Sequence, residues 1–352
     1  MTPLASLLME RIAAEGPMSL ADYMATCLLH PEHGVYTARD PLGSAGDFTT
    51  APEISQMFGE LVGLALARAW MDQGQPGFTL AELGPGRGTL MADILRVGRK
   101  VPGFVEAAEV VLVEASPLLR TRQEETLAGF DVTWVDHVTD LPQAPLWLVA
   151  NEFFDALPVR QFERQGDGWC ERRVGARDGA LTLGRTEPTA VAALAHRLGD
   201  TRDGDIVEIA PSLPPIAEAI GQRIADHGGA ALIIDYGDWR SLGDTLQALH
   251  RHQRVDPLAH PGAADLTTHV DFEAIATAAP CAHSRLTTQG VFLERLGITP
   301  RAQQLAAGLQ GAALETHVAA HRRLTHPEEM GTLFKVLGLM PHGAPPIAGL
   351  ET

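Results

Sequence analysis

A glycine-rich turn between a predicted strand and a predicted helix constrains the fold of this chain more than any other feature. Residues 78–83 form a short apolar run, residues 84–88 read Gly-Pro-Gly-Arg-Gly, and residues 89–97 have the apolar spacing of a helix. Similar short runs predict further strands at 110–113, 132–135 and 146–150. Strands that alternate with helices at this spacing predict an α/β fold, in which helices cover a parallel sheet.

The remainder of the chain is expected to be built around this core. The predicted segments are an N-terminal helical segment at 1–60, the α/β core at 61–240, a mostly helical insertion or lid at 241–330, and a strand returning to the core at 331–352. The chain has no repeats and no low-complexity linker, which favours one elaborated domain over two independent ones.

Two local patterns refine this organisation. Thr50 and Glu53 have the spacing of a capping box at the start of a helix. Residues 169–174 and 180–183 predict a hairpin, because a short turn sequence separates two apolar runs.

Composition excludes several classes of protein. The chain has 352 residues, 45% of them hydrophobic, and a formal charge of -17, which argues against disorder and against nucleic acid as a partner. The negative charge either favours a cationic partner or simply maintains solubility. No run approaches the ~18 apolar residues of a membrane span. The first residues lack the pattern of a signal or transit peptide, so we expect a cytoplasmic protein.

Cysteine and histidine spacing predicts neither a metal site nor a disulfide framework. The three cysteines are scattered and form no CxxC pair. The fourteen histidines include close pairs but no HExxH motif, so we interpret them as surface or packing residues.

The glycine-rich turn favours one class of cofactor. A dinucleotide fingerprint would have a third glycine where this chain has Thr89. S-adenosylmethionine fits better: Glu82 would hold its ammonium, the backbone of the turn would face its carboxylate, and Glu114 would accept hydrogen bonds from its ribose hydroxyls. The predicted cofactor residues are Glu82, Gly84, Pro85, Gly86, Gly88, Glu114 and Asp47. Asp47 precedes a predicted helix and would fold over the cofactor, although a turn also explains it. The alternative for the glycines is a tight strand–helix connection.

The segment after the 146–150 strand is the predicted chemistry site. It reads Asn151-Glu-Phe-Phe-Asp155, with acids beside aromatics at a strand's carboxyl end, an arrangement that suits a cation. Glu152 is the first candidate to orient a methyl acceptor, Asp155 the second, and Asn151 belongs to the same block. His269 is a candidate general base. The alternatives are that the acids cap a turn, that the phenylalanines are core, and that His269 lies in an ordinary turn before a helix.

Several blocks resemble the MidA-like methyltransferases. They include residues 47–61, 82–89 and 151–158, together with Asp235-Tyr-Gly237, residues 262–272 and residues 330–334. The resemblance implies a class I S-adenosylmethionine-dependent methyltransferase fold with a Rossmann-like sheet. Family cofactor positions correspond to Gly84, Gly86, Gly88 and Glu114. Glu152 is similar in place to the first glutamate of the double-glutamate loop of protein arginine methyltransferases, and no clear second glutamate is present.

The resemblance also implies an activity. The family's mitochondrial members assist assembly of respiratory complex I and symmetrically dimethylate a protein arginine, whereas this chain resembles a bacterial member, whose substrate need not be the same. We therefore expect a protein arginine N-methyltransferase acting on a complex I subunit or a similar protein. The alternatives are a small-molecule methyltransferase, an assembly chaperone that binds the cofactor with little catalysis, and, least favoured, an NAD-dependent dehydrogenase. The sequence leaves open the substrate protein, the degree of methylation, the mobility of 241–330, and the oligomeric state, including a homodimer.

Overall fold

The computed structural model describes residues 2–38, 50–250 and 252–351, whose contacts form two compact units. The sheet unit comprises 49–154, 214–239 and 270–352, and the small unit comprises 1–48, 155–213 and 240–269. The sequence favoured one elaborated domain, with segment boundaries at 60, 240 and 330. The contacts divide the chain differently because segments distant in sequence share each core.

The sheet unit contains a sheet with the strand order β15-β17-β10-β5-β2-β3-β4. Strands β4, β3, β2, β5 and β10 are parallel, and β17 is antiparallel to β10. The bounds are β2 (Phe78–Leu83), β3 (Ala108–Val113), β4 (Val132–Val135), β5 (Leu146–Asn151), β10 (Gly229–Asp238), β14 (Val270–Asp271), β15 (Ala282–His283), β16 (Thr287–Thr288) and β17 (Phe334–Met340). The predicted α/β fold and the returning C-terminal strand are confirmed.

The strand order places a topological switch point between β2 and β5. From β2 the chain proceeds outward to β3 and β4, and then returns to β5 on the other side of β2. In sheets of this type, ligands bind beyond the carboxyl ends of the strands at such a point. A ligand-binding site is therefore expected at the segments that follow β2 and β5.

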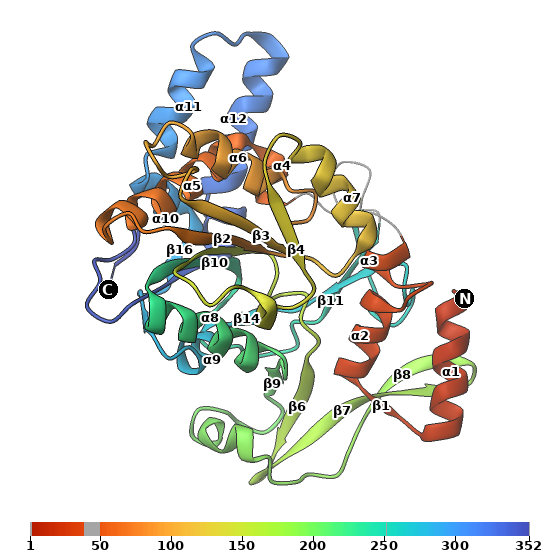
Figure 1. Cartoon of the computed structure of the whole chain (residues 1–352). Helices are drawn as coiled ribbons and strands as arrows, with labels where there is room; N and C mark the ends of the chain where they lie inside the picture. The colour runs from red at the N-terminus through yellow and green to blue at the C-terminus, as the bar shows by residue number, and fades with distance from the viewer. Residues whose placement is uncertain (1, 39–49, 251, 352) are drawn as a thin grey trace. The chain divides into compact units, whose positions relative to one another are not determined.

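Helices cover both faces of this sheet. Figure 1 shows α5 and α6 on one face and α8 on the other. The bounds are α4 (Ala51–Ile54), α5 (Gln56–Asp72), α6 (Thr89–Gly98), α7 (Pro117–Thr126), α8 (Leu213–His227), α9 (Phe272–Ala278), α10 (Gln289–Arg295), α11 (Ile298–Ala306), α12 (Gly311–Thr325) and α13 (Met330–Leu333), with a short 3-10 helix at Val138–Asp140.

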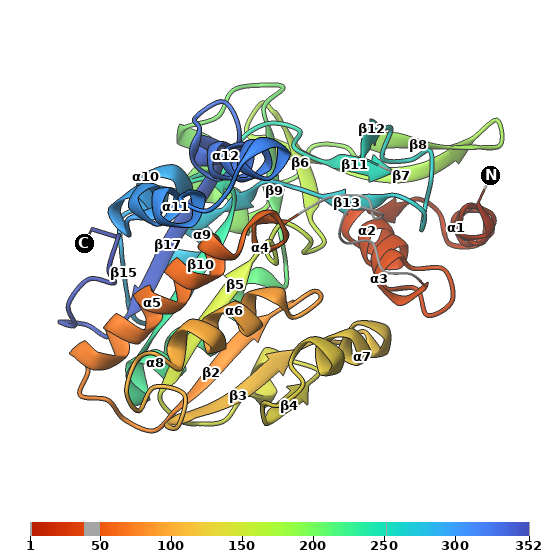
Figure 2. The same cartoon turned by 90° about the horizontal axis from the view of Figure 1, so that it is seen from above.

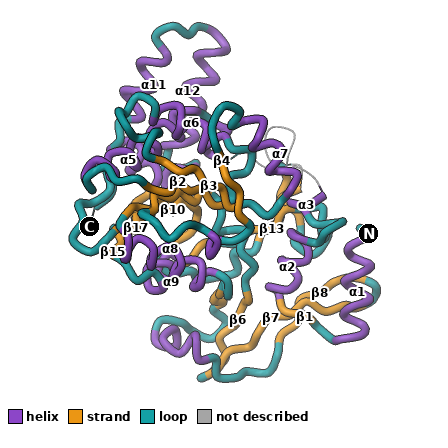
Figure 3. The backbone as a smooth tube through the Cα atoms, in the orientation of Figure 1, coloured by secondary structure: helices purple, strands orange, loops and turns teal. Residues whose placement is uncertain are grey.

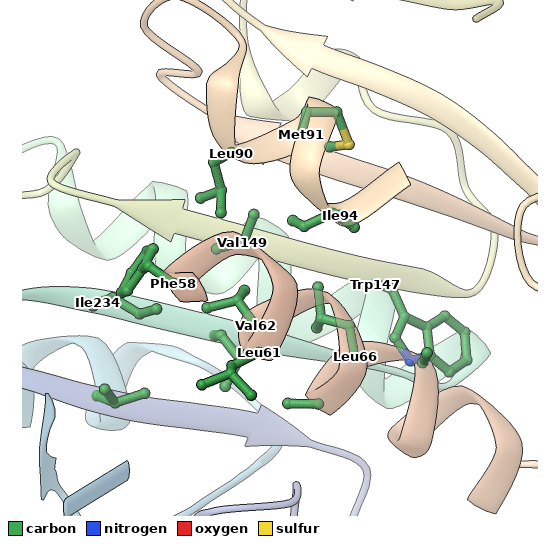
Figure 4. Close-up of a cluster of buried hydrophobic side chains, with 14 of the residues drawn as sticks. Phe58, Leu61, Val62, Leu66, Leu90, Met91, Ile94, Trp147, Val149 and Ile234 are labelled. Atoms are coloured by element: carbon green, nitrogen blue, oxygen red, sulfur yellow. The ribbon is translucent and has the colours of Figure 1, made fainter. Parts of the chain in front are cut away.

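The main hydrophobic core lies between the sheet and helices α5 and α6. Figure 4 shows Phe58 and Val62 of α5 and Ile94 of α6 facing Val149 of β5 and Ile234 of β10. Each of these side chains is fully buried. Burial of such a side chain contributes about 1.5–3 kcal/mol relative to exposure, so this layer fixes the helices on the sheet and the ends of β2 and β5 in space.

The predicted capping box at Thr50 is wrong. The Thr50 side chain makes no capping hydrogen bond, and the helix that it begins, α4, ends at Ile54. A second helix, α5, then starts with Ser55 as its cap, and the Ser55 hydroxyl accepts a hydrogen bond from the Met57 N–H. The prediction failed because the Glu53 carboxylate has a partner outside its own helix, described below.

The small unit combines N-terminal helices with two antiparallel sheets. One sheet has the order β1-β7-β6-β9, with β8 paired to β7, and the other has the order β12-β11-β13. The bounds are α1 (Pro3–Glu15), β1 (Met18–Ser19), α2 (Leu20–Leu29), α3 (Val35–Ala38), β6 (Arg160–Gln165), β7 (Gly168–Arg177), β8 (Ala180–Arg185), β9 (Ile206–Ile209), β11 (Gln247–His250), β12 (Gln253–Val255) and β13 (Asp265–Thr267), with a 3-10 helix at Ala192–Gly199. The predicted hairpin is confirmed as β7 and β8. Helices α1 and α2 pack against β7 (Figure 2), and apolar residues of these elements form a core of their own.

Residues 241–330, expected to be mostly helical, begin with strands. β11, β12 and β13 come first, and helices appear only from α9 onward; Figure 3 shows α11 and α12 among them in purple. None of the helices in the described part of the chain has the length and apolar composition needed to span a lipid bilayer.

Candidate functional site

The turn after β2 has the backbone conformation that its glycines allow. Gly84 and Gly88 have φ values of 58° and 82°, a region that residues with a Cβ rarely adopt. Gly88 is the N-cap of α6, and its N–H donates to the Pro85 carbonyl at 2.7 Å. A Cβ at Gly84 would lie 2.9 Å from Cδ2 of Phe153. Glycine at 84 is therefore required both by conformation and by the close approach of the segment that follows β5.

Glu82 places a buried carboxylate just before this turn. It is 3% exposed, and within the described residues its Oε2 has no hydrogen-bond partner. Burial raises the pKa of Glu82 to about 8; a backbone hydrogen bond from Met91, in the first turn of α6, opposes this shift, and the nearby Glu114 carboxyl adds to it. A buried acceptor oxygen without a donor is costly unless a ligand supplies one.

Glu114 follows β3 and is tied to the turn by Gln123, which the sequence analysis missed. Gln123 of α7 is fully buried, and its Nε2 donates to the Gly86 carbonyl at 2.8 Å and to Oε2 of Glu114 at 3.1 Å. The Ser116 N–H donates to Oε1 of Glu114 at 2.7 Å. Burial raises the pKa of Glu114, and these hydrogen bonds oppose the rise. One amide thus fixes the distance between two predicted cofactor positions. Its spacing from Glu114 carries no signal that would have revealed this.

Thr89 has a partner that no local pattern revealed. Its hydroxyl donates to Oε1 of Glu53 in α4. Where a dinucleotide fingerprint would have a glycine, this chain thus has a side chain that joins the start of α6 to α4. At this position the chain differs from that fingerprint in structure as well as in sequence, because the Thr89 side chain makes a contact that a glycine could not make.

β5 ends at Asn151, and Glu152 follows it beside this turn. Oε1 of Glu152 accepts hydrogen bonds from the Ala51 N–H and from Nδ2 of Asn151, both at 3.1 Å. Asn151 is buried, and its Oδ1 has no partner among the described residues. Leu83 pairs with Ala150 in the parallel β2–β5 ladder, so the side chains of Glu82 and Asn151 leave the same face of the sheet. Glu82, Gly84, Asn151 and Glu152 are therefore brought together.

Asp155 and His269 belong to the small unit, where the carbonyl of buried Asp155 accepts the Thr268 N–H at 2.9 Å. The His269 N–H donates to the Thr245 hydroxyl at 2.8 Å. Asp47 lies outside the described residues. Within residues 2–38, 50–250 and 252–351, no group of three or more His, Cys, Asp or Glu side chains could hold a metal ion.

The cluster at the switch point fits S-adenosyl-L-methionine. The Glu82 oxygen that has no partner among the described residues matches an ammonium, and the glycine turn leaves backbone groups without side chains over them. The Glu114 carboxylate accepts from the Ser116 N–H and from Gln123, and an ionised carboxylate has further lone pairs that can accept from a ribose hydroxyl.

Comparison with known proteins gives consistent results. Residues 61–291 match a family described as "Putative S-adenosyl-L-methionine-dependent methyltransferase". The Mus musculus protein named "Protein arginine methyltransferase NDUFAF7, mitochondrial" is 38% identical over 97% of this chain and 85% of its own length. The Homo sapiens protein of the same name is 35% identical over 97% and 84%. A crystal structure from Burkholderia thailandensis, bound to S-adenosyl-homocysteine, matches with a TM-score of 0.84 and 31% identity over 98% of this chain and 93% of that chain.

Proposed function

Because this chain belongs to the S-adenosyl-L-methionine-dependent methyltransferase family that it matches, we propose that it methylates an arginine side chain of a protein. The names of the mouse and human relatives support the choice of arginine. The observation that carries the proposal is the position of Glu152, a carboxylate at the end of β5 beside the glycine turn.

In this proposal the cofactor is held by residues that follow β2 and β3. S-adenosyl-L-methionine supplies an electrophilic methyl group on a sulfonium. Glu82 binds the ammonium of the amino acid part, and Glu114 accepts hydrogen bonds from the ribose. Gln123 keeps Glu114 at a fixed distance from the Gly86 carbonyl, so the contact of Glu114 with the ribose is preorganised.

Glu152 would act on the acceptor. An arginine guanidinium stays protonated at cellular pH and is a poor nucleophile. A carboxylate that binds one edge of it fixes its plane and draws positive charge away from the opposite nitrogen. The hydrogen bonds from Ala51 and Asn151 hold one oxygen of Glu152, which limits rotation of the carboxylate. Asp155 as a second acid and His269 as a base stay predictions.

The finer parts of the proposal concern product and partner. We propose symmetric dimethylation and a respiratory complex I subunit or similar protein as the substrate, following the MidA-like resemblance. A cytoplasmic location, a bacterial source and a homodimer stay predictions. The alternatives are methylation of a small molecule and a chaperone that binds the cofactor with little turnover. Transfer of radioactive label into lysate protein, compared with the small-molecule fraction, separates these alternatives.

The Glu152→Gln variant tests the role of the carboxylate. The substitution keeps the size of the side chain but removes its charge, so we expect methyl transfer to fall by about 10²–10³-fold. Affinity for S-adenosyl-homocysteine, measured by calorimetry, should stay close to that of the wild type. Glu124→Gln is the matched control, because Glu124 is an exposed carboxylate on α7. Wild-type turnover in Glu152→Gln would assign Glu152 a purely structural role.

A further inference from the structure

The turn that carries Glu152 has a strained backbone. Glu152 has a φ of 53°, in the left-handed region that residues with a Cβ rarely adopt. Such a conformation costs on the order of 1–3 kcal/mol and persists only where the surroundings impose it. Something next to this turn must therefore hold it.

The contacts that hold the turn come from β10. The Glu152 N–H donates to the Ile234 carbonyl at 2.9 Å. The Phe154 N–H donates to Oδ2 of Asp235 at 3.0 Å, and the other oxygen, Oδ1, accepts the Tyr236 N–H at 2.9 Å. Two consecutive residues of β10 thus hold the backbone on either side of Phe153.

Asp235 is built as a rigid support. Its side chain is fully buried, and its strand is paired on one side with β5 and on the other with β17. In the register, Ile234 is opposite Asn151 and Asp235 is opposite Lys335. A carboxylate is suited to this position because both of its oxygens accept, whereas an asparagine has one acceptor oxygen and an amide nitrogen that would oppose one of the N–H groups.

We propose that Asp235 is a positioning residue that aims the Glu152 carboxylate, a role that rests on the proposed function of Glu152. By fixing the Phe154 amide, Asp235 sets the strained turn in a single conformation. The same turn places the Phe153 ring against Gly84, so the support also sets the spacing between the acceptor side and the glycine turn. Asp235 itself has no contact with reacting atoms in this scheme.

The Asp235→Asn variant tests the proposal through a split between turnover and binding. A displacement of about 1 Å at a reacting group can lower the rate about 100-fold, so we expect kcat to fall by about that factor. Affinity for S-adenosyl-homocysteine should change less than about threefold, because Glu82 lies on β2 and Glu114 follows β3. Asp238→Asn is the matched control: Asp238 lies on the same strand and accepts the N–H of Trp239, but it is exposed.

Hydrogen exchange of the wild-type protein gives a test that needs no variant. If Asp235 holds the turn, the Phe154 amide exchanges only when the sheet itself opens, as slowly as the amides at the centre of β10. Exchange at the rate of an exposed loop would overturn the proposal. So would a folded Asp235→Asn variant with kcat within threefold of the wild type, or one that loses turnover, ligand affinity and thermal stability together. If Glu152→Gln retains full activity, the proposed function of Glu152 fails instead, whatever Asp235 does.

Discussion

The affinity for the cofactor should depend on pH through Glu82. Burial, with a smaller contribution from the nearby Glu114 carboxyl, holds the pKa of this carboxyl at about 8. A ligand ammonium pairs with the ionised form, so binding must release the proton at any lower pH. With this pKa, about 99% of the carboxyl is protonated at pH 6 and about half at pH 8.

The size of the effect follows from these fractions. A ligand that binds only the ionised carboxylate should bind about 50-fold more tightly at pH 8 than at pH 6, a difference of about 2 kcal/mol. The assay is calorimetry with S-adenosyl-homocysteine at pH 6, 7 and 8, in buffers with different ionisation enthalpies, which reports the number of protons released. Glu82→Gln is the control, because titration of the ligand itself is common to both proteins.

Two results would refute this reasoning. One is a wild-type affinity that does not change over this range, and the other is an equal pH dependence in Glu82→Gln. The free energy of unfolding of the ligand-free protein, measured as a function of pH, provides a second test. Because the folded-state pKa is raised from 4.5, the stabilising contribution of the protonated carboxyl is present below pH 4.5 and is lost as pH rises towards 8.

Two further predictions concern the turn and its neighbours. Glu114→Ala should weaken binding of S-adenosyl-homocysteine by at least ~1 kcal/mol, the scale of a hydrogen bond to a charged group, and calorimetry that finds unchanged affinity would remove Glu114 from the site. Gly84→Ala should lower the free energy of unfolding by about 1–2 kcal/mol from the backbone alone, and further from the contact with Phe153, as measured by urea denaturation. Gly129→Ala is its control, because Gly129 has a φ of 93° and no atom within 4 Å of an added Cβ; equal losses in the two variants would contradict the role of Phe153.

Sequence patterns predicted the parts of the site that depend on local order. The alternation of strands and helices predicted the sheet, and the glycines predicted a tight turn after β2, which the structure shows to be left-handed at Gly84 and Gly88. Glu82, Glu114 and Glu152 were chosen as candidates because each follows or ends a predicted strand. Parallel strands bring their carboxyl ends to one edge, so position along the chain was sufficient to group these residues.

The supporting contacts could not be predicted in this way. Gln123 lies within a helix, Glu53 was assigned to a capping box, and Asp235 was named only in a block that carries the family resemblance. Each of these side chains has a partner far away in the sequence. Such partners depend on strand register and on the way in which a helix packs, and neither is encoded by the spacing of nearby residues.

The sequence by itself determined the periodicity of the elements, the positions that need glycine, and the acids at the strand ends, because these follow from backbone geometry over a few residues. Only the tertiary structure decided that 155–213 and 240–269 share a unit with the N-terminal helices, and that Asp235 supports the turn at Glu152. The physical reason is that buried polar groups require partners, and the fold as a whole determines which distant groups can supply them.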